Sequence, residues 1–284
     1  MTSYSLSTTL PSALKDIAIA TWYALGMTGC EETASGDDVS IICYFKDKTA
    51  ADTAKADLLS QFPEAHISIG EVADQDWNAQ WKASMQPALV APGVWASPHW
   101  LPPKAALSDC WIRIEPKMAF GTGHHATTRL AATAVQRISG RLALGYSLLD
   151  IGCGSGILCF MALHSGARCA IGVDIDPACA ENLAENRVNN PTLPGARFAV
   201  GTPDMFTSSA RFDCVVMNMI LTESQGLLDF IACALRPGGL MLWSGILSEE
   251  KNKVIELASK KGFSIVEETN EEEWWCGVFS PGRL

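Results

Sequence analysis

The chain has 284 residues and a mass of 30.5 kDa, and 48% of its residues are hydrophobic against 18% charged. A chain of this length and composition buries a sizeable core in about two domains, which excludes a disordered or fibrous protein. It carries 31 acidic and 21 basic residues, for a net charge of -10, so a general affinity for DNA or RNA is excluded as well.

The sequence predicts neither export nor membrane insertion. No stretch reaches the roughly 18 consecutive apolar residues of a membrane span, and residues 1–16 lack a basic flank followed by an apolar block. The 10 cysteines are scattered, with no C-x-x-C pair and no Cys/His cluster at zinc spacing. We expect small buried cysteines in a reduced, cytoplasmic protein that contacts no membrane and no nucleic acid directly.

Residues 1–72 are expected to form a small α+β (ferredoxin-like) domain. The pattern predicts a helix around Ala13–Gly26, a strand at Val39–Phe45, a helix at Thr49–Gln61 and a short alternating run near Ala65–Ile69. Residues 1–82 hold 12 acidic and 5 basic residues, a net of 5 − 12 = -7. This charge either steers a basic protein partner or only keeps the domain soluble, and the sequence leaves both readings open.

Residues 73–108 are expected to connect this domain to a second one. Trp77 and Trp81 lie one helical turn apart in Asp74–Met85, which favours a connecting helix that packs two domains together. The stretch Pro87–Pro103 is rich in Pro and Trp and is interpreted as an irregular junction with short β-like pieces.

Strands and helices alternate through residues 109–284, which predicts an α/β domain with a mainly parallel sheet covered on both faces. The expected strands are Cys110–Ile114, Ser147–Ile151, Ala170–Asp174, Arg197–Val200, Cys214–Met217, Gly239–Trp243, Ser264–Thr269 and Trp274–Phe279, and the expected helices are Thr127–Ser139, Ile157–Ser165, Pro177–Asn189, Ser224–Leu235 and Glu249–Lys261.

A glycine-rich turn joins a predicted strand to a predicted helix at Leu148–Ile157, with the spacing G-x-G-x-G. Such a turn lets the backbone approach a nucleotide-like ligand, and the helix N-terminus offers free N–H groups. The spacing is one residue short of the dinucleotide pattern, and no G-K-[ST] follows, which argues against an NTPase. Asp150 at the end of the strand could pair with an ammonium group of the ligand. A purely structural turn shares this composition and remains an alternative.

Acidic residues close the next predicted strand, in the run Asp174-Ile175-Asp176-Pro177. Asp174 stands where a carboxylate can accept hydrogen bonds from both hydroxyls of a ribose. Asp176 before Pro177 fits a helix N-cap better. With the glycine turn and the run LRPGGL at residues 235–240, this pair resembles the class I S-adenosylmethionine methyltransferases, which implies a Rossmann-like domain and S-adenosyl-L-methionine as cofactor.

Two further motifs carry polar groups toward the same region. The loop AFGTGHHATT at residues 119–128 precedes the cofactor strand and could fold over the ligand, although Thr127 or Thr128 could simply cap the helix. Its adjacent histidines do not match the spacing of helical metal ligands, so no metal is expected.

An apolar strand ends at Asn218, which places an amide at the carboxyl edge of the sheet; an Asx turn is the alternative.

The runs DWNAQWK (76–82), AFGTG (119–123) and SGIL (244–247), added to the glycine turn and the Asp174 run, resemble the methyltransferase family of large-subunit ribosomal protein L-eleven (L11), the PrmA type. The resemblance covers nearly the whole chain. It implies methyl transfer from S-adenosylmethionine to lysine or N-terminal amino groups of L11, with the N-terminal domain gripping that protein. The sequence departs from the family loop G-T-G-T-H-P-T-T at His124 and Ala126, and from its N-I-L at Met219 and Ile220.

The resemblance and the motifs together give the expected site, in a protein expected to be a monomer. Asn218, with nearby backbone carbonyls, is expected to orient the neutral acceptor amine. A related methyltransferase with another protein or small-molecule substrate, and a cofactor-binding protein without catalysis, remain as alternatives. The expected cofactor-binding residues are Phe120, Gly121, Thr127, Thr128, Asp150, Gly152, Gly154, Gly156, Asp174, Ile175 and Asn218.

Overall fold

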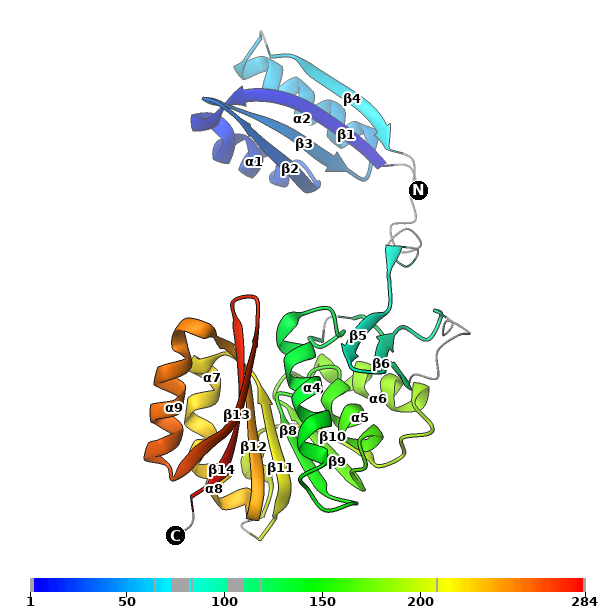
Figure 1. The fold of residues 1–284 in the computed structure, drawn as a ribbon. Coiled ribbons are helices and arrows are strands. Elements are labelled where there is room, and N and C mark those ends of the chain that lie inside the picture. Colours follow the sequence, from blue (N-terminus) through cyan, green and yellow to red (C-terminus); the bar gives the residue numbers. More distant parts are fainter. Residues whose placement is uncertain are drawn as a thin grey trace. The chain divides into compact units, whose positions relative to one another are not determined.

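The computed structural model describes residues 3–63, 65–72, 82, 84–101, 110–117, 119–207 and 209–282. Contacts divide the chain into two compact units, Met1–Met85 and Gln86–Leu284. Each unit is a separate layered structure of strands and helices (Figure 1). No helix in the described part of the chain has the length and apolar character needed to cross a membrane.

The first unit is a four-stranded antiparallel sheet with two helices. Its strand order is β2-β3-β1-β4, and its chain order is the βαββαβ arrangement of ferredoxin-like domains. This confirms the predicted α+β class. The elements are β1 (Ser3–Pro11), α1 (Lys15–Ala24), β2 (Met27–Ser35), β3 (Asp38–Phe45), α2 (Lys48–Gln61) and β4 (Ile67–Val72).

The sequence patterns did not predict β1 and β2. In β1 the buried positions alternate as Leu6, Thr8 and Leu10, so one inward side chain is polar and the apolar period is broken. β2 is an edge strand of the sheet and holds Glu31 and Glu32. An edge strand has only one neighbouring strand and needs few apolar residues. Tertiary pairing with β3, rather than the local sequence pattern, therefore determines that these residues form a strand.

The expected connecting helix with Trp77 and Trp81 lies outside the described residues, apart from residues 82, 84 and 85. The expected irregular junction that follows contains a hairpin of two short strands, β5 (Ala88–Ala91) and β6 (Val94–Ser97), which fall within the second unit. The strand expected at Cys110–Ile114 is observed as β7 (Cys110–Arg113), but its placement in the main sheet was wrong. It pairs in parallel with β6 and completes a small sheet of order β5-β6-β7.

The main sheet of the second unit has seven strands in the order β10-β9-β8-β11-β12-β14-β13. Strands β8 to β12 are parallel, and β14 is inserted antiparallel between β12 and β13. This confirms the predicted mainly parallel α/β domain. The strands are β8 (Ser147–Ile151), β9 (Cys169–Asp174), β10 (Ala196–Val200), β11 (Phe212–Asn218), β12 (Leu235–Leu247), β13 (Phe263–Glu271) and β14 (Trp274–Pro281).

Helices bury both faces of this sheet (Figure 1). Leu148 and Val216 pack with α4 (Ala126–Ser139) and α5 (Ile157–His164), whereas their neighbours Leu149 and Val215 pack on the other face with α8 (Leu228–Ala234) and α9 (Lys251–Lys260). Burial on both faces explains why the strand sequences are uninterrupted apolar runs. The helix expected at Ser224–Leu235 is instead split between α7 (Leu221–Ser224) and α8, and α6 (Cys179–Asn189) packs against β10.

The strand order reverses between β8 and β11. From β8 the chain proceeds outward through β9 and β10, and then returns to the other side of β8 to form β11. In open α/β sheets, ligands bind in the crevice outside the carboxyl ends of the strands at such a reversal. The ends of β8 and β11, at Ile151 and Asn218, are therefore where the fold itself predicts a site.

Candidate functional site

A cavity of about 500 Å³ opens at the carboxyl ends of β8, β9 and β11, which is in the size range of small-molecule and cofactor pockets. Loop 119–125, the beginning of α7 and the first residue of β14 complete its walls. Its lining residues are Ala119, Phe120, His125, Thr127, Gly152, Gly154, Asp174, Ile175, Asp176, Cys179, Asn218, Met219, Ile220, Glu223, Gly245 and Trp274.

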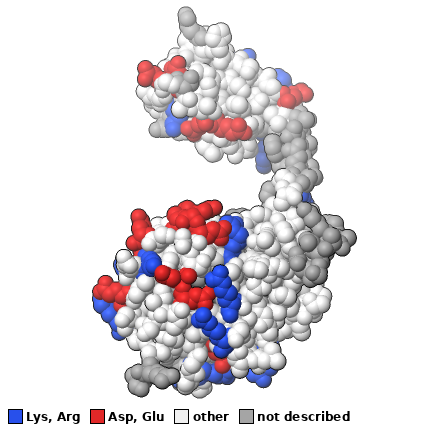
Figure 2. All heavy atoms as spheres, in the orientation of Figure 1, with Lys and Arg blue, Asp and Glu red and all other residues white. Residues whose placement is uncertain are grey.

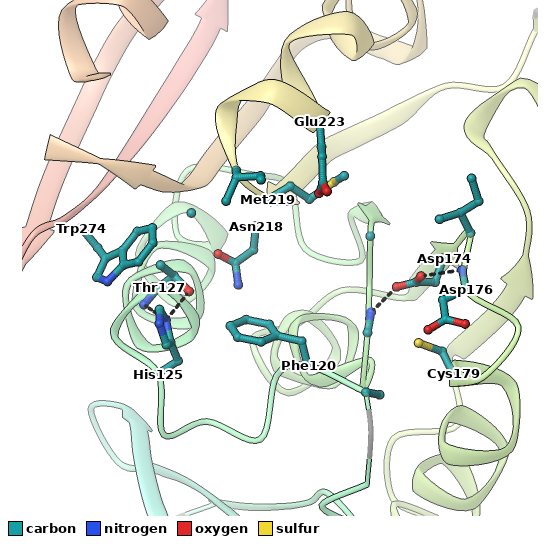
Figure 3. Close-up of a pocket in the computed structure, with 16 residues that line it drawn as sticks. Phe120, His125, Thr127, Asp174, Asp176, Cys179, Asn218, Met219, Glu223 and Trp274 are labelled. Carbon is teal, nitrogen blue, oxygen red and sulfur yellow. Dashed lines mark hydrogen bonds between the residues drawn. The ribbon is translucent and has the colours of Figure 1, made fainter. Parts of the chain in front are cut away.

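The pocket has two chemically different ends (Figure 3). At one end Asp174 and Asp176 lie beside Cys179, which opens α6. At the other end Asn218 and Trp274 face the side chains at the N-terminus of α4, and the Phe120 ring lies between the two ends. The carboxylates and the amide thus act on different parts of any ligand that fills the cavity.

The glycine turn after β8 forms the floor between these ends. Gly154 has a φ of +51°, and a Cβ at this position would collide with the carbonyl oxygen of Phe120. Gly245 plays a similar part on β12, where φ is +81° and a Cβ would lie 2.7 Å from the backbone nitrogen of Met219. Both positions need glycine because the backbones that form the pocket approach one another closely.

Asp174 holds the glycine turn in place with its carboxylate. One oxygen accepts a hydrogen bond from the Gly154 N–H at 2.7 Å, and the other accepts from the Asp176 N–H at 3.0 Å. Each carboxylate oxygen can accept a further hydrogen bond, and the side chain is partly exposed at the pocket. The carboxylate can therefore brace the turn and still bind a ligand hydroxyl.

Asn218 is the last residue of β11 and lines the opposite end of the pocket. Its Oδ1 atom is buried and has no hydrogen-bond partner among the described residues. The next residue, Met219, donates its backbone N–H to the Ser244 carbonyl at 3.1 Å, which fixes the turn after the strand. A buried amide oxygen without a partner costs free energy unless a ligand or water satisfies it, so it indicates a binding position.

An aromatic row closes the same end. The Phe120 ring meets the His125 ring edge to face at a centroid distance of 5.3 Å, and His125 meets Trp274 in the same way at 5.2 Å. His125 is also the N-cap of α4, where its Nδ1 accepts the Thr127 N–H at 3.3 Å. Of the two adjacent histidines, His125 therefore caps the helix. Neither Thr127 nor Thr128 is the cap.

The pocket is acidic. Asp174, Asp176 and Glu223 contribute three carboxylates, and none of the described residues that line it is Lys or Arg. No hydrogen bond or ion pair links the Glu223 carboxylate to another described residue, and its side chain is exposed. The electrostatics of the pocket therefore favour a positively charged ligand or an approaching ammonium group.

The structure brings most of the predicted residues to the pocket but not all. Gly121 lies behind the pocket wall, where its carbonyl accepts from the Ser155 hydroxyl at 2.7 Å, and Gly156 caps α5 against the Phe198 ring. Thr128 and Asp150 are buried beneath the surface, with 0% and 1% of their area exposed. The predicted residues that line the pocket are Phe120, Thr127, Gly152, Gly154, Asp174, Ile175 and Asn218.

Sequence reasoning missed several lining residues. Trp274 opens the last strand, and only the pairing of β14 with β12 brings it next to the site, opposite Leu247. Gly245 lies in the run SGIL (244–247), and its φ of +81°, which requires glycine, is visible only in the structure. The residues that line the pocket without having been predicted are Ala119, His125, Asp176, Cys179, Met219, Ile220, Glu223, Gly245 and Trp274.

Comparison with known proteins identifies the family. The model of the family "Ribosomal protein L11 methyltransferase (PrmA)" matches residues 10–280. The chain belongs to this family. A curated ribosomal protein L11 methyltransferase from Thermus thermophilus is 39% identical over 204 residues, which are 72% of this chain and 77% of the relative. One from Pseudomonas paraeruginosa is 37% identical over 221 residues, which are 77% of this chain and 71% of the relative.

A solved structure of the same family confirms the fold. The crystal structure of the ribosomal protein L11 methylase from Lactobacillus delbrueckii subsp. bulgaricus superimposes with a TM-score of 0.63 at 22% identity. It covers 70% of this chain and all of that one. Membership in the PrmA family confirms the methyltransferase class predicted from the glycine turn, the Asp174 run and the loop at residues 119–128.

The buried carboxyl of Asp150 predicts a distinctive pH dependence of stability. Burial, and then the negative charge of Asp174, raise its pKa from 3.8 to about 7. The folded protein therefore holds a proton that the unfolded chain has released, so this group's contribution to stability is lost as pH rises from about 4 to about 7. Relative to Asp150→Asn, the wild type should lose about 2 kcal/mol of unfolding free energy between about pH 5 and about pH 7.5.

Denaturant unfolding of the wild type and of Asp150→Asn at each pH measures this difference. Every other titrating group is present in both proteins, so its contribution cancels in the comparison. Asp213→Asn is a matched control with the opposite sign. Despite the opposing effect of burial, hydrogen bonds from Ser147 and the guanidinium of Arg236 lower the pKa of Asp213. Its contribution is therefore already complete at about pH 5. Parallel profiles for the wild type and Asp150→Asn would show that the Asp150 carboxyl does not titrate in this range.

Proposed function

We propose that this protein transfers methyl groups from S-adenosyl-L-methionine to amino groups of ribosomal protein L11. The observation that carries the proposal is the pocket at the ends of β8 and β11, where a glycine turn, the acidic last residue of β9 and an amide oxygen with no partner among the described residues meet in one cavity. The names of the curated PrmA relatives support L11 as the substrate.

The described residues fit S-adenosylmethionine. The cavity of about 500 Å³ accommodates a ligand of this size, and glycine in its floor lets the backbones that form the pocket approach one another closely. Asp174 would hold the ribose hydroxyls, and Phe120 and Ile175 would contact the nucleoside and the methionine chain. When bound, the cofactor supplies a methyl group activated by its sulfonium, so neither a metal nor a covalent enzyme intermediate is required.

The residues of the chain then have to bind and orient an amine. A lysine side chain, with a reference pKa of about 10.4, arrives protonated and must lose a proton before it reacts. The carboxylate of Glu223 would attract the ammonium form at the pocket entrance. The Asn218 amide oxygen, which lacks a partner, would accept a hydrogen bond from the neutral amine and direct its lone pair, so positioning supplies much of the rate acceleration.

The surface beside the pocket supports a basic protein substrate. A second, smaller hollow is lined by Leu247, Ser248, Glu249 and Glu273. It lies next to the pocket residues Gly245 and Trp274 along the chain. Figure 2 shows Asp and Glu side chains gathered on the second unit beside a row of Lys and Arg. Acidic groups near the entrance steer a cationic segment to the site without adding much affinity.

Residues 1–72, which lie within the first unit, are the proposed substrate-binding domain, with residues 73–108 as linker and residues 109–284 as the catalytic domain; β5 and β6 of the proposed linker fall within the second unit. The net charge of -7 on residues 1–82 supports a basic partner for it. The same proposal takes the enzyme to be a monomer. It also takes the enzyme to be cytoplasmic, because it would meet a ribosomal protein substrate in the cytoplasm.

The function is tested by incubating the purified protein with methyl-labelled S-adenosylmethionine and the free ribosomal proteins of its own source, followed by mass spectrometry. We expect label on the lysine or N-terminal amino groups of L11. Label on another protein would keep the methyltransferase class and overturn the substrate. Cofactor binding without label on any protein would favour a non-catalytic cofactor-binding protein.

Asp174→Ala should raise the Kd for S-adenosylhomocysteine about tenfold or more, because it removes the proposed acceptor of the ribose hydroxyls. Isothermal titration calorimetry with the natural ligand and with a deoxyribose analogue separates this role from bracing of the Gly154 N–H. The wild type should discriminate between the two ligands, and the variant should not. Asp229→Ala, which removes a surface partner of Lys261, is the control and should bind as the wild type does. Discrimination that survives in Asp174→Ala would remove the ribose assignment.

Asn218→Ala should lower kcat about a hundredfold while the Kd for the cofactor changes less than about threefold, because the amide acts on the acceptor amine. Steady-state kinetics with L11 and calorimetry with the cofactor give the two quantities. An equal loss in both would show that Asn218 only binds the cofactor.

A further inference from the structure

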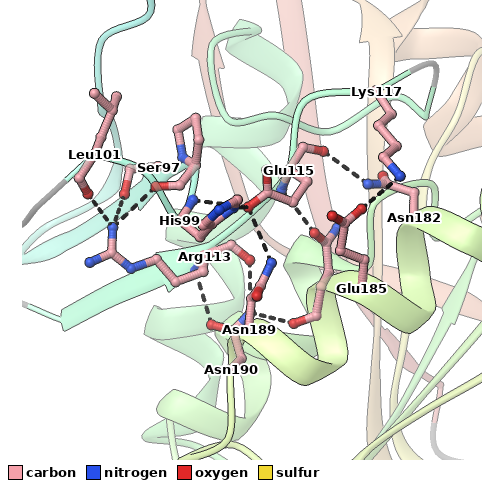
Figure 4. A network of polar contacts seen from close by, with 12 residues as sticks. Ser97, His99, Leu101, Arg113, Glu115, Lys117, Asn182, Glu185, Asn189 and Asn190 are labelled. Atoms are coloured by element: carbon pink, nitrogen blue, oxygen red, sulfur yellow. Dashed lines mark hydrogen bonds and ion pairs between the residues drawn. The ribbon is translucent and has the colours of Figure 1, made fainter. Parts of the chain in front are cut away.

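The segment that leads into loop 119–125 is held by side chains of α6 rather than by a sheet. β7 ends at Arg113, and its last bond to β6 runs from the Ile114 N–H to the Ser97 carbonyl at 2.9 Å. The Glu115 N–H donates to the Asn186 Oδ1 at 2.8 Å, and the Glu115 carbonyl accepts from the Asn182 Nδ2 at 2.9 Å. Two amide side chains, one helical turn apart, thus take the place of sheet neighbours; Figure 4 shows Asn182 beside Glu115.

The same Asn186 side chain reaches the glycine turn. Its Nδ2 donates to the carbonyl of Ser155 at 2.9 Å, and 0% of the area of either residue is exposed. One amide group therefore joins the segment before the loop to the turn that forms the floor of the pocket. Asparagine is suited to this because it carries a donor and an acceptor on one rigid plane.

Ser155 completes the connection on the far side of the loop. Its backbone N–H donates to the carbonyl of Phe120 at 2.9 Å, and its hydroxyl donates to the carbonyl of Gly121 at 2.7 Å. Phe120 lines the pocket between its two ends. Asn186 and Ser155, which we call the loop clamp, therefore fix both the entry to the loop and its pocket-lining residue against the glycine turn.

The buried side chain of Glu115 strengthens the entry. It accepts hydrogen bonds from the His99 backbone N–H at 2.9 Å and from the Asn189 Nδ2 at 3.1 Å, and it contacts the His99 ring. The segment 113–117 is thereby attached to α6 and to the residues after β6 (Figure 4). The segment before the loop is thus anchored on one side to α6 and on the other to the residues after β6.

We propose that the loop clamp is a positioning device for the cofactor: Asn186, which touches neither cofactor nor substrate, holds loop 119–125 in the conformation that closes the pocket. This inference rests on the proposed cofactor site. Without the clamp the loop must be ordered by the ligand at the moment of binding, and that ordering cost lowers the affinity. The chemistry itself, at the Asn218 end, is left unchanged.

Asn190 gives a matched control on the same helix. It is 4% exposed, and its side chain makes three hydrogen bonds. It accepts from the Arg113 N–H at 2.9 Å, and it donates to the Arg113 carbonyl at 2.7 Å and to the Asn186 carbonyl at 2.7 Å. Asn190→Ala therefore removes bonds between α6 and the end of β7 and keeps the Asn186 side chain with its bonds to Glu115 and Ser155. Both variants should lose stability, because each leaves backbone groups without their side-chain partner.

The experiment compares the full-length wild type, Asn186→Ala and Asn190→Ala. Calorimetry with S-adenosylhomocysteine should show a Kd about tenfold higher for Asn186→Ala and within about twofold of the wild type for Asn190→Ala. The KM for the cofactor should rise in step while kcat stays within about threefold. Without ligand, hydrogen exchange of the Ser155 amide and of loop residues 119–125 should be faster only in Asn186→Ala.

Equal Kd values and equal exchange rates for the two variants would overturn the proposal, because Asn186 would then be structural only. A wild type that does not bind the cofactor would overturn the proposed function instead, and the exchange data without ligand would still decide the clamp. If Asn186→Ala fails to fold, Ser155→Ala removes the hydroxyl bond to the Gly121 carbonyl, together with the long bond at 3.4 Å from the Ile157 N–H, and keeps the backbone bonds of residue 155. It should raise the Kd and the loop exchange rate in the same direction, and unchanged values would overturn the proposal.

Discussion

Burial of both faces of the main sheet is the constraint on which the rest of the second unit depends. Because helices cover Leu148 and Val216 on one side and Leu149 and Val215 on the other, the middle of these strands has no place for polar chemistry. Ligand-binding groups are confined to the strand ends, where the backbone leaves the sheet. Asp150 shows the cost of departing from this rule, since its carboxyl within β8 is driven toward the protonated form.

The sequence predicts what local pattern and strand position determine. The main sheet, its helices and the residues that end strands, such as Asp174 and Asn218, follow from apolar runs and the polar residue after each run. What it does not predict comes from tertiary pairing: β2 at a sheet edge, β7 in the small sheet, and Trp274, which β14 carries to the pocket. Asn182, Asn186 and Asn190 were visible at four-residue spacing, but only the contacts of α6 show that they replace sheet partners.

Charge and hydrogen bonding divide the work within the pocket. In the proposed mechanism the carboxylates attract a cationic amine, and the Asn218 Oδ1, which has no hydrogen-bond partner among the described residues, accepts a hydrogen bond from the amine and orients it. The carboxylates stabilise the ammonium form, so in this proposal the amine loses its proton to solvent as it passes from them to the Asn218 end of the pocket.

The insertion of β14 between β12 and β13 has a consequence for the order of assembly. Residues 274–281 are made after every other strand, yet they occupy an interior position of the sheet and bring Trp274 to the pocket wall. Until the ribosome has delivered this segment, β12 and β13 have no partner between them and the aromatic row cannot form. A nascent chain that has not reached residue 274 therefore lacks Trp274 and this part of the pocket wall.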